Sequence, residues 1–157
     1  MAAEREDALE RLMAKALHMV LTRPYTRAEL ARRLTAKGAP EHHVTAVADR
    51  LERAGLINDA QYARALVERY SGKGYGVLKI RDELCRRGVP RAHWADALAG
   101  AEDPADRLDT LVRSRLEGRD PDRKELKRVF DALARRGYPW QDISAALRRY
   151  GAELDEE

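Results

Sequence analysis

Gly72, Lys73, Gly74, Tyr75 and Gly76 place three glycines and a lysine within five positions, a composition typical of loops that bind phosphate. A phosphate-binding loop follows a β-strand and is continued by Lys-Ser/Thr, or it forms part of a βαβ unit. Helix-forming sequence lies on both sides of this run, so we expect no nucleotide site. We interpret the run as a flexible hinge between two helices, with Lys73 and Tyr75 exposed for contact.

The histidines, the cysteine and the serines lack the spacing of a metal site or a catalytic site. His42 and His43 are adjacent and point about 100° apart on a helix, so they do not share one ion. Cys85 and His93 lack the further ligands that tetrahedral zinc requires. Neither a neighbouring histidine nor a nucleophile-elbow motif accompanies Ser71, Ser114 and Ser144. We therefore expect no metal, no cofactor and no enzymatic activity.

Arginine pairs punctuate a chain of mild positive charge. The formal net charge is +3, and 36% of the residues are charged while only 6% are aromatic, which favours small cores between helices. The pairs are Arg32-Arg33, Arg86-Arg87, Arg135-Arg136 and Arg148-Arg149. The second and third pairs stand just before a glycine, where a helix C-terminus favours cations. Solvated helix faces therefore explain the pairs without a partner, although they do not exclude one.

The remaining composition indicates a soluble, cytoplasmic protein. Cys85 is the one cysteine, so no disulfide can form within the chain, and we interpret it as a structural residue of a helix. The chain contains no apolar run as long as a membrane span, and its charged start is unlike a signal peptide.

A Gly-x-Pro sequence occurs three times, at Gly38, Gly88 and Gly137, with a spacing of about fifty residues. Apolar residues stand four and eight positions before each glycine, and six and ten positions after it. This pattern predicts a helix, a glycine that ends it, a proline that starts the next helix, and that second helix. The chain is therefore a tandem array of helical units.

Capping residues locate further helix boundaries. Thr26 and Glu29 form a capping box, which predicts that a helix starts between them. The other predicted starts are Asn58 or Asp59, Asp103-Pro104 and Asp120-Pro121. We expect the last helix to end at Gly151.

These signals predict an all-α protein of three tandem three-helix repeats, with about nine helices in an elongated array. The predicted segments are residues 1–57 with an N-terminal extension, 58–102, and 103–157 with an acidic tail. A helix of about 12 residues is roughly 18 Å long, so three units in series reach about 60 Å.

Trp140 departs from the repeat, because the equivalent positions hold the polar residues Glu41 and Arg91. The ring is either a packing contact or a binding anchor, and we favour packing. Trp94 differs, since it stands at the position of Val44 and is expected in the core.

A distinctive set of residues begins at the end of the first repeat and runs through the second. It comprises Ile57-Asn58-Asp59, Gln61-Tyr62-Ala63, Val67, Arg69, Gly76, Ile80, Glu83-Leu84 and Gly88-Val89. Matching residues upstream are Arg23, Tyr25-Thr26, Glu29-Leu30, Leu34 and Lys37-Gly38. On these residues the chain resembles the RecX regulatory-protein family over roughly residues 14–151. Tyr62 stands where the family often has Phe, and Lys79 where Arg is common, but both keep the physical character.

The resemblance implies a modulator, generally an inhibitor, of the RecA recombinase, with roles in recombination, DNA repair and the SOS response. It implies a fold of three tandem three-helix repeats that binds along the helical groove of the RecA–DNA filament. Binding there limits filament growth, ATPase, strand exchange and coprotease activity. Some members contact DNA, so phosphates of single- or double-stranded DNA are further expected partners. We expect a monomer without cofactor and without membrane attachment.

The second repeat resembles the RecX family most clearly, and basic residues are dense in it. We predict that they form a central basic surface that contacts RecA or its DNA: Arg69, Lys73, Arg81, Arg86 and Arg87. Contacts repeated over neighbouring filament subunits add through effective concentration.

Two other functions fit parts of the sequence. Residues from Thr26 to Ile57 also look like a helix-turn-helix core, which makes a DNA-binding transcriptional regulator the main alternative. Any three-helix unit with a glycine turn gives that pattern, and no β-wing segment follows it. A helical-repeat scaffold for another protein is the third possibility.

Overall fold

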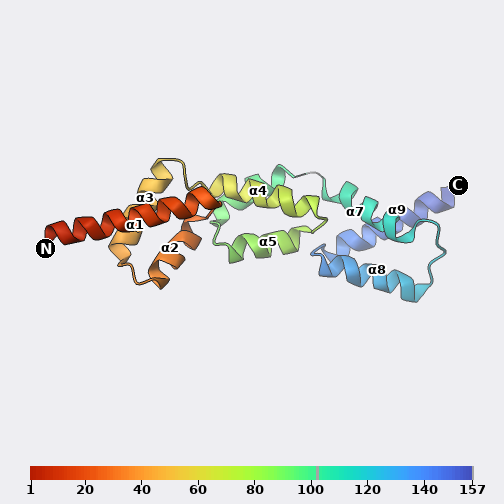
Figure 1. Ribbon diagram of the computed structural model, residues 1–157. Coiled ribbons are helices and arrows are strands. Elements are labelled where there is room, and N and C mark those ends of the chain that lie inside the picture. The colour runs from red at the N-terminus through yellow and green to blue at the C-terminus, as the bar shows by residue number, and fades with distance from the viewer. Residues whose placement is uncertain (102, 157) are drawn as a thin grey trace. The chain divides into compact units, whose positions relative to one another are not determined.

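The computed structural model describes residues 1–101 and 103–156, and the side chains of the last helix up to Gly151. All regular structure within these residues is helical, with nine α-helices, one short 3-10 helix and no strand (Figure 1). The helices are α1 (Ala2–Thr22), α2 (Arg27–Ala36), α3 (Glu41–Arg53), α4 (Asp59–Gly72), α5 (Val77–Arg86), the 3-10 helix η1 (Arg91–His93), α6 (Trp94–Ala99), α7 (Pro104–Leu116), α8 (Arg123–Arg135) and α9 (Trp140–Glu156). The prediction of an all-α chain of three-helix repeats is confirmed.

Packing groups the chain into two compact units. Unit 1 comprises Met1–Ala63 and Leu84–Ala95, and unit 2 comprises Arg64–Glu83 and Asp96–Glu157. Helices α4 and α5 each contribute residues to both units. The predicted boundary after residue 57 falls between α3 and α4, whereas Glu102 and Glu157, the predicted ends of the other two segments, lie outside the described residues.

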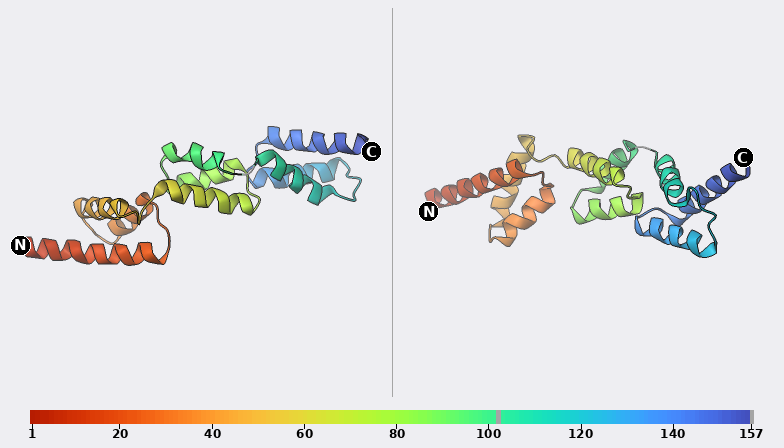
Figure 2. Two further views of the ribbon diagram at one scale, coloured as in Figure 1. Left: turned by 90° about the horizontal axis from the view of Figure 1, so that it is seen from above. Right: turned by 45° about the vertical axis from the view of Figure 1, so that its right-hand side comes forward.

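The core of unit 1 lies between α1, α2 and α3, which pack against one another (Figures 1 and 2). Its buried residues are Ala16, Tyr25, Leu30, Leu34, Val44, Val47, Leu51 and Ile57. Leu30, Leu34 and Val44 are among them and stand at positions that the sequence pattern marks on both sides of Gly38. Each fully buried aliphatic side chain contributes about 1.5–3 kcal/mol, so this small cluster is sufficient to hold three helices together.

The core of unit 2 lies where α9 packs against α7 and α8 (Figure 2). Its buried residues are Leu108, Val112, Leu116, Val129, Leu133, Tyr138, Ile143 and Ala146. Helix α8 exposes charged residues on the opposite face, which makes it strongly amphipathic.

Side-chain caps begin several helices as expected. The Thr26 hydroxyl accepts a hydrogen bond from the Glu29 amide at 3.1 Å, and Asn58 accepts one from the Gln61 amide at 3.0 Å. Asp103 caps α7 through the Ala105 amide at 2.9 Å.

Two predicted helix boundaries are wrong. Helix α8 starts at Arg123 rather than after Asp120, because the Asp122 carboxylate accepts from the Glu125 amide at 2.9 Å and is the N-cap. Helix α9 continues through Gly151 to Glu156. Gly151 is not among the glycines with positive φ, so it does not form a left-handed helix end.

The three Gly-x-Pro turns end helices as predicted. Gly38, Gly88 and Gly137 have φ angles of +94°, +75° and +98°, values that glycine adopts without the strain of a side chain. The prolines stand one residue earlier than expected: Pro40 and Pro90 precede the first residue of α3 and of η1. The second half of the middle repeat is also less regular than predicted, since η1 and the short α6 replace one helix.

Among the described residues, no helix is both long enough and apolar enough to cross a membrane.

Candidate protein and nucleic-acid interface

Two tyrosines and three cations gather where α4 leads into α5, within unit 2. The rings of Tyr70 and Tyr75 lie 5.5 Å apart and are tilted by 47°. The Arg69 guanidinium lies 5.6 Å and the Lys73 Nζ 5.9 Å from the centre of the Tyr70 ring. The Lys79 Nζ lies 4.6 Å from the centre of the Tyr75 ring. We call these five residues the tyrosine cluster.

Backbone geometry builds the tyrosine cluster. The α4 helix ends when the Lys73 amide donates to the Arg69 carbonyl, and the Tyr75 amide then folds back to the Tyr70 carbonyl at 3.1 Å. Gly74 takes a φ of +84° between them, which lets the chain reverse without strain. The reversal brings the two rings together from opposite sides of the turn.

The glycine run at 72–76 is fixed in place, so its interpretation as a flexible hinge is wrong. The Gly76 amide donates to the Arg136 carbonyl at 2.8 Å, and the Leu78 amide donates to the Gly137 carbonyl at 2.9 Å. The buried Tyr138 hydroxyl donates to the Gly74 carbonyl at 3.0 Å. These partners come from the turn between α8 and α9, and they are more than 55 residues away in sequence, beyond the reach of local patterns.

Only glycine fits where these two turns meet. A Cβ on Gly76 would lie 2.5 Å from the carbonyl carbon of Gly137, a distance at which the backbone must shift. A Cβ on Gly137 would lie 2.5 Å from the amide nitrogen of Lys79. The close approach therefore positions Lys79 directly.

The tyrosine cluster is rich in unneutralised positive charge. Among the side chains that the structure describes, residues 1–101 and 103–151, Arg69, Lys73 and Lys79 form no ion pair with a carboxylate. The Arg136 guanidinium donates to the Lys73 carbonyl at 3.2 Å and adds a further cation beside them. Cations beside ring faces are suited to phosphate groups and to stacked bases.

The structure brings together only some of the five predicted contact residues. Arg69 and Lys73 lie in the tyrosine cluster. Arg81 is exposed on α5, two positions beyond Lys79 and thus about 200° around the helix from it. Arg86 and Arg87 belong to unit 1.

Arg87 is bound into unit 1. Its Nη1 donates to the Tyr62 hydroxyl at 2.9 Å and lies 3.9 Å from Glu29 Oε1. The Tyr62 hydroxyl donates to the same Glu29 oxygen at 3.3 Å. The Thr26 hydroxyl donates to the Arg87 carbonyl at 2.5 Å, which attaches the end of α5 to the start of α2. Arg87 therefore has a structural role, and its contact with a partner stays a prediction.

Burial raises the pKa of two tyrosines, the half-buried Tyr62 and the buried Tyr138. Burial raises the pKa of Tyr62, and the Glu29 carboxylate raises it further while Arg87 acts in the opposite direction. Burial also raises the pKa of Tyr138, against the charges of Arg107 and Arg136. Both hydroxyls therefore remain hydrogen-bond donors at neutral pH.

Residues of the tyrosine cluster that sequence reasoning missed are Tyr70 and Lys79. Two tyrosines five positions apart, with cations before, between and after them around a glycine turn, are the signal that indicates them.

One further expectation is wrong. Trp140 does not pack, because 64% of its surface is exposed at the first turn of α9. Cys85 lies on helix α5, as expected of a helical residue, and is exposed there. Trp94 is half-buried, and its indole N–H donates to the Val89 carbonyl at 2.9 Å.

Comparison with known proteins gives consistent matches. Residues 13–51 match the family described as RecX, first three-helix domain, and residues 58–98 match RecX, second three-helix domain. A protein named Regulatory protein RecX from Pseudomonas putida is 33% identical over 143 residues, which cover 90% of each chain. One of the same name from Xanthomonas axonopodis pv. citri is 36% identical over 136 residues, 85% of this chain and 84% of the relative. The crystal structure of RecX from Lactobacillus salivarius has the same fold, with a TM-score of 0.82 at 22% identity over 97% of this chain and 99% of that one.

Proposed function

The chain belongs to the RecX family of regulatory proteins, and we propose on this basis that it modulates the RecA recombinase, mainly as an inhibitor. It binds along the groove of the RecA–DNA filament and limits filament growth, ATP hydrolysis, strand exchange and coprotease activity. It acts by binding rather than by catalysis, as a cytoplasmic monomer.

The observation that carries the proposal is the position of the tyrosine cluster. Its residues, 69–79, lie inside the segment that matches the second three-helix domain of RecX. Three cations without carboxylate partners among the described residues, arranged on two ring faces, are suited to a surface that carries phosphates.

The tyrosine cluster contributes affinity for DNA in two ways. The cations contact backbone phosphates, which gives binding without sequence preference and with a strong dependence on salt. The tyrosine rings offer faces to unstacked bases, and each such contact contributes about 1–3 kcal/mol. A recombinase filament consists of protein subunits bound along DNA. The tyrosine cluster can therefore contact phosphates and bases, while other residues of the protein contact the subunits.

Helical repeats suit this target because a filament repeats its own subunits. Contacts made by separate segments of one chain add through effective concentration, so modest single contacts give tight binding. A bound molecule then occupies positions that filament growth or strand exchange requires.

The experiment that tests the proposal is ATP hydrolysis by RecA on single-stranded DNA, measured while the protein is titrated. We expect hydrolysis to fall as the protein is added. The same protein is titrated onto random duplex DNA and onto a pool of duplex sequences. Unchanged hydrolysis together with tight, sequence-selective duplex binding would instead identify a helix-turn-helix regulator.

A further inference from the structure

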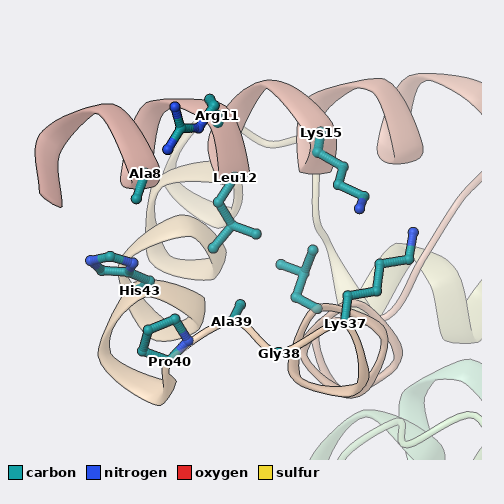
Figure 3. A pocket seen from close by; sticks show the side chains of 10 residues that line it. Ala8, Arg11, Leu12, Lys15, Lys37, Gly38, Ala39, Pro40 and His43 are labelled. Carbon is teal, nitrogen blue, oxygen red and sulfur yellow. The ribbon is translucent and has the colours of Figure 1, made fainter. Parts of the chain in front are cut away.

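A cleft in unit 1 opens beside the first Gly-x-Pro turn, between α1, the end of α2 and the start of α3 (Figure 3). Its volume is about 290 Å³, near the lower limit of about 300 Å³ for ligand pockets. The walls are aliphatic and include Leu12, Leu34, Ala39 and Pro40. The cleft is therefore large enough for an apolar side chain, and its aliphatic walls would contact one favourably.

Basic side chains surround these walls. Arg11, Lys15, Lys37 and His43 line the cleft, and none of its lining residues is acidic. The amino groups of Lys15 and Lys37 point toward one another across it (Figure 3). The pKa of Lys37 is lowered, first by a hydrogen bond with Lys15 and then by the charge of Lys15. The two amino groups thus face each other with no carboxylate among the residues that line the cleft.

The helix dipole explains only part of this charge. Lys37 stands at the C-terminal end of α2, where a cation is favoured. Arg11 and Lys15 lie in the middle of α1, which ends at Thr22, so no helix end attracts them. Among the described side chains, those of residues 1–101 and 103–151, neither of these two residues nor Lys37 forms an ion pair. Their convergence on one cleft needs a different cause.

The three Gly-x-Pro turns differ in how closely other chain segments pack against their glycines, and the turn at Gly38, beside the cleft, has open space there. A Cβ on Gly88 would meet Ala28 at 2.5 Å within unit 1, and a Cβ on Gly137 would meet Lys79 at 2.5 Å within unit 2. Each of these two turns packs against the start of a helix from the preceding repeat. Nothing lies within 4 Å of the same position on Gly38. The equivalent turns at Gly88 and Gly137 pack against other helices of the chain, whereas the turn at Gly38 is available to a partner.

We propose that this cleft binds an acidic peptide segment of a partner protein, with one aliphatic side chain between the walls and flanking carboxylates on Lys15, Lys37 and Arg11. Charge complementarity and the aliphatic walls both indicate this occupant. A nucleic acid fits less well, because the imidazole of His43 is the one ring among the lining residues and the walls are otherwise aliphatic. The site is separate from the tyrosine cluster, and the proposal does not depend on RecA.

The test is fluorescence anisotropy with a short labelled synthetic peptide that carries one leucine between pairs of glutamates. We expect wild-type protein to bind it and Lys15→Glu protein to bind it about tenfold more weakly, since a reversed charge repels the carboxylates. Lys15 is exposed in the middle of a helix, so glutamate preserves the fold. Lys124→Glu, the same charge change at an exposed position of α8, is expected to leave peptide affinity unchanged.

Three control peptides separate the contribution of charge to binding from that of the aliphatic side chain. A peptide with glutamine for glutamate and one with serine for leucine each bind more weakly if both charge and the aliphatic side chain contribute. A peptide with lysine in place of one glutamate recovers affinity for the Lys15→Glu protein. Equal peptide binding by wild-type and Lys15→Glu protein overturns the proposal. So does a wild-type cleft that ignores the peptide but binds a short single-stranded oligonucleotide in a Lys15-dependent way.

Discussion

Gly88 lies so close to Ala28 that a Cβ at Gly88 would fall 2.5 Å from the Cβ of Ala28. The contact joins the end of α5 to the start of α2, and the hydrogen bonds from Thr26 to Arg87 and from Arg32 to the Arg86 carbonyl lie beside it. The Gly-x-Pro turn is therefore a packing element between repeats as well as a helix end.

Gly88→Ala is expected to lower the free energy of unfolding by about 3 kcal/mol. The left-handed conformation costs a side chain about 1–2 kcal/mol, and overpacking against Ala28 adds about 1–3 kcal/mol. Gly38→Ala is the matched control, because φ is also positive there but the space is open, and we expect a loss of only about 1 kcal/mol. Urea denaturation at equilibrium measures both. Equal losses at the two positions would mean that the close contact contributes nothing.

Arg87→Met is expected to destabilise the protein by about 1–1.5 kcal/mol, because it removes the hydrogen bond to the Tyr62 hydroxyl and weakens the attachment of α5 to α2. Arg81→Met, an exposed change on the preceding helix α5, is expected to cost less than about 0.5 kcal/mol. Thermal unfolding followed by circular dichroism compares the two. A similar melting temperature for both variants contradicts a structural role for Arg87.

Stability is expected to fall above about pH 10, in part because of Tyr138. Its pKa is raised above the ordinary value of 10.0 by burial, so the folded protein holds this proton more tightly than the unfolded chain does. The contribution is complete below pH 10 and is lost as the pH rises through the folded pKa. Tyr138→Phe is expected to make the alkaline decline shallower and, at neutral pH, to cost about 1 kcal/mol for the hydrogen bond to Gly74. Denaturation at a series of pH values measures this, and an unchanged slope contradicts it.

Tyr70→Leu and Tyr75→Leu are each expected to weaken binding to single-stranded DNA about tenfold, since a base–ring contact contributes about 1–3 kcal/mol. Tyr150→Leu, on α9, is the control and is expected to bind as the wild type does. Fluorescence titration at several salt concentrations provides the measurement. If all three variants bind alike, the rings do not contact bases.

Local sequence signals predicted the helices and their repeat well. Thr26, Asn58 and Asp103 cap helices through their own neighbours, and the glycine of each Gly-x-Pro turn acts through its own backbone. These interactions span a few residues, so the sequence displays them directly. Asp120 failed as a start because Asp122 is an equally good cap two positions later.

Long-range contacts explain what the sequence did not reveal. The run at Gly72–Gly76 looks flexible in isolation, but the carbonyls of Arg136 and Gly137 hold it. Arg87 looks like a surface cation, but Tyr62 and Glu29 hold it at the start of α2. The tyrosine cluster was predicted only in part, since local sequence does not show that the chain reverses at Gly74 and places the Tyr75 ring beside the Tyr70 ring.

We infer that this protein inhibits RecA through the tyrosine cluster. The measurement that tests this is RecA ATP hydrolysis on single-stranded DNA with the Lys73→Glu/Lys79→Glu variant. The charge-matched control is Lys124→Glu/Lys127→Glu, at two exposed positions of α8. Circular dichroism first verifies that both variants are folded. We predict that the control inhibits as the wild type does, while the cluster variant needs at least about tenfold more protein for the same inhibition. Equal inhibition by the two folded variants would contradict the claim.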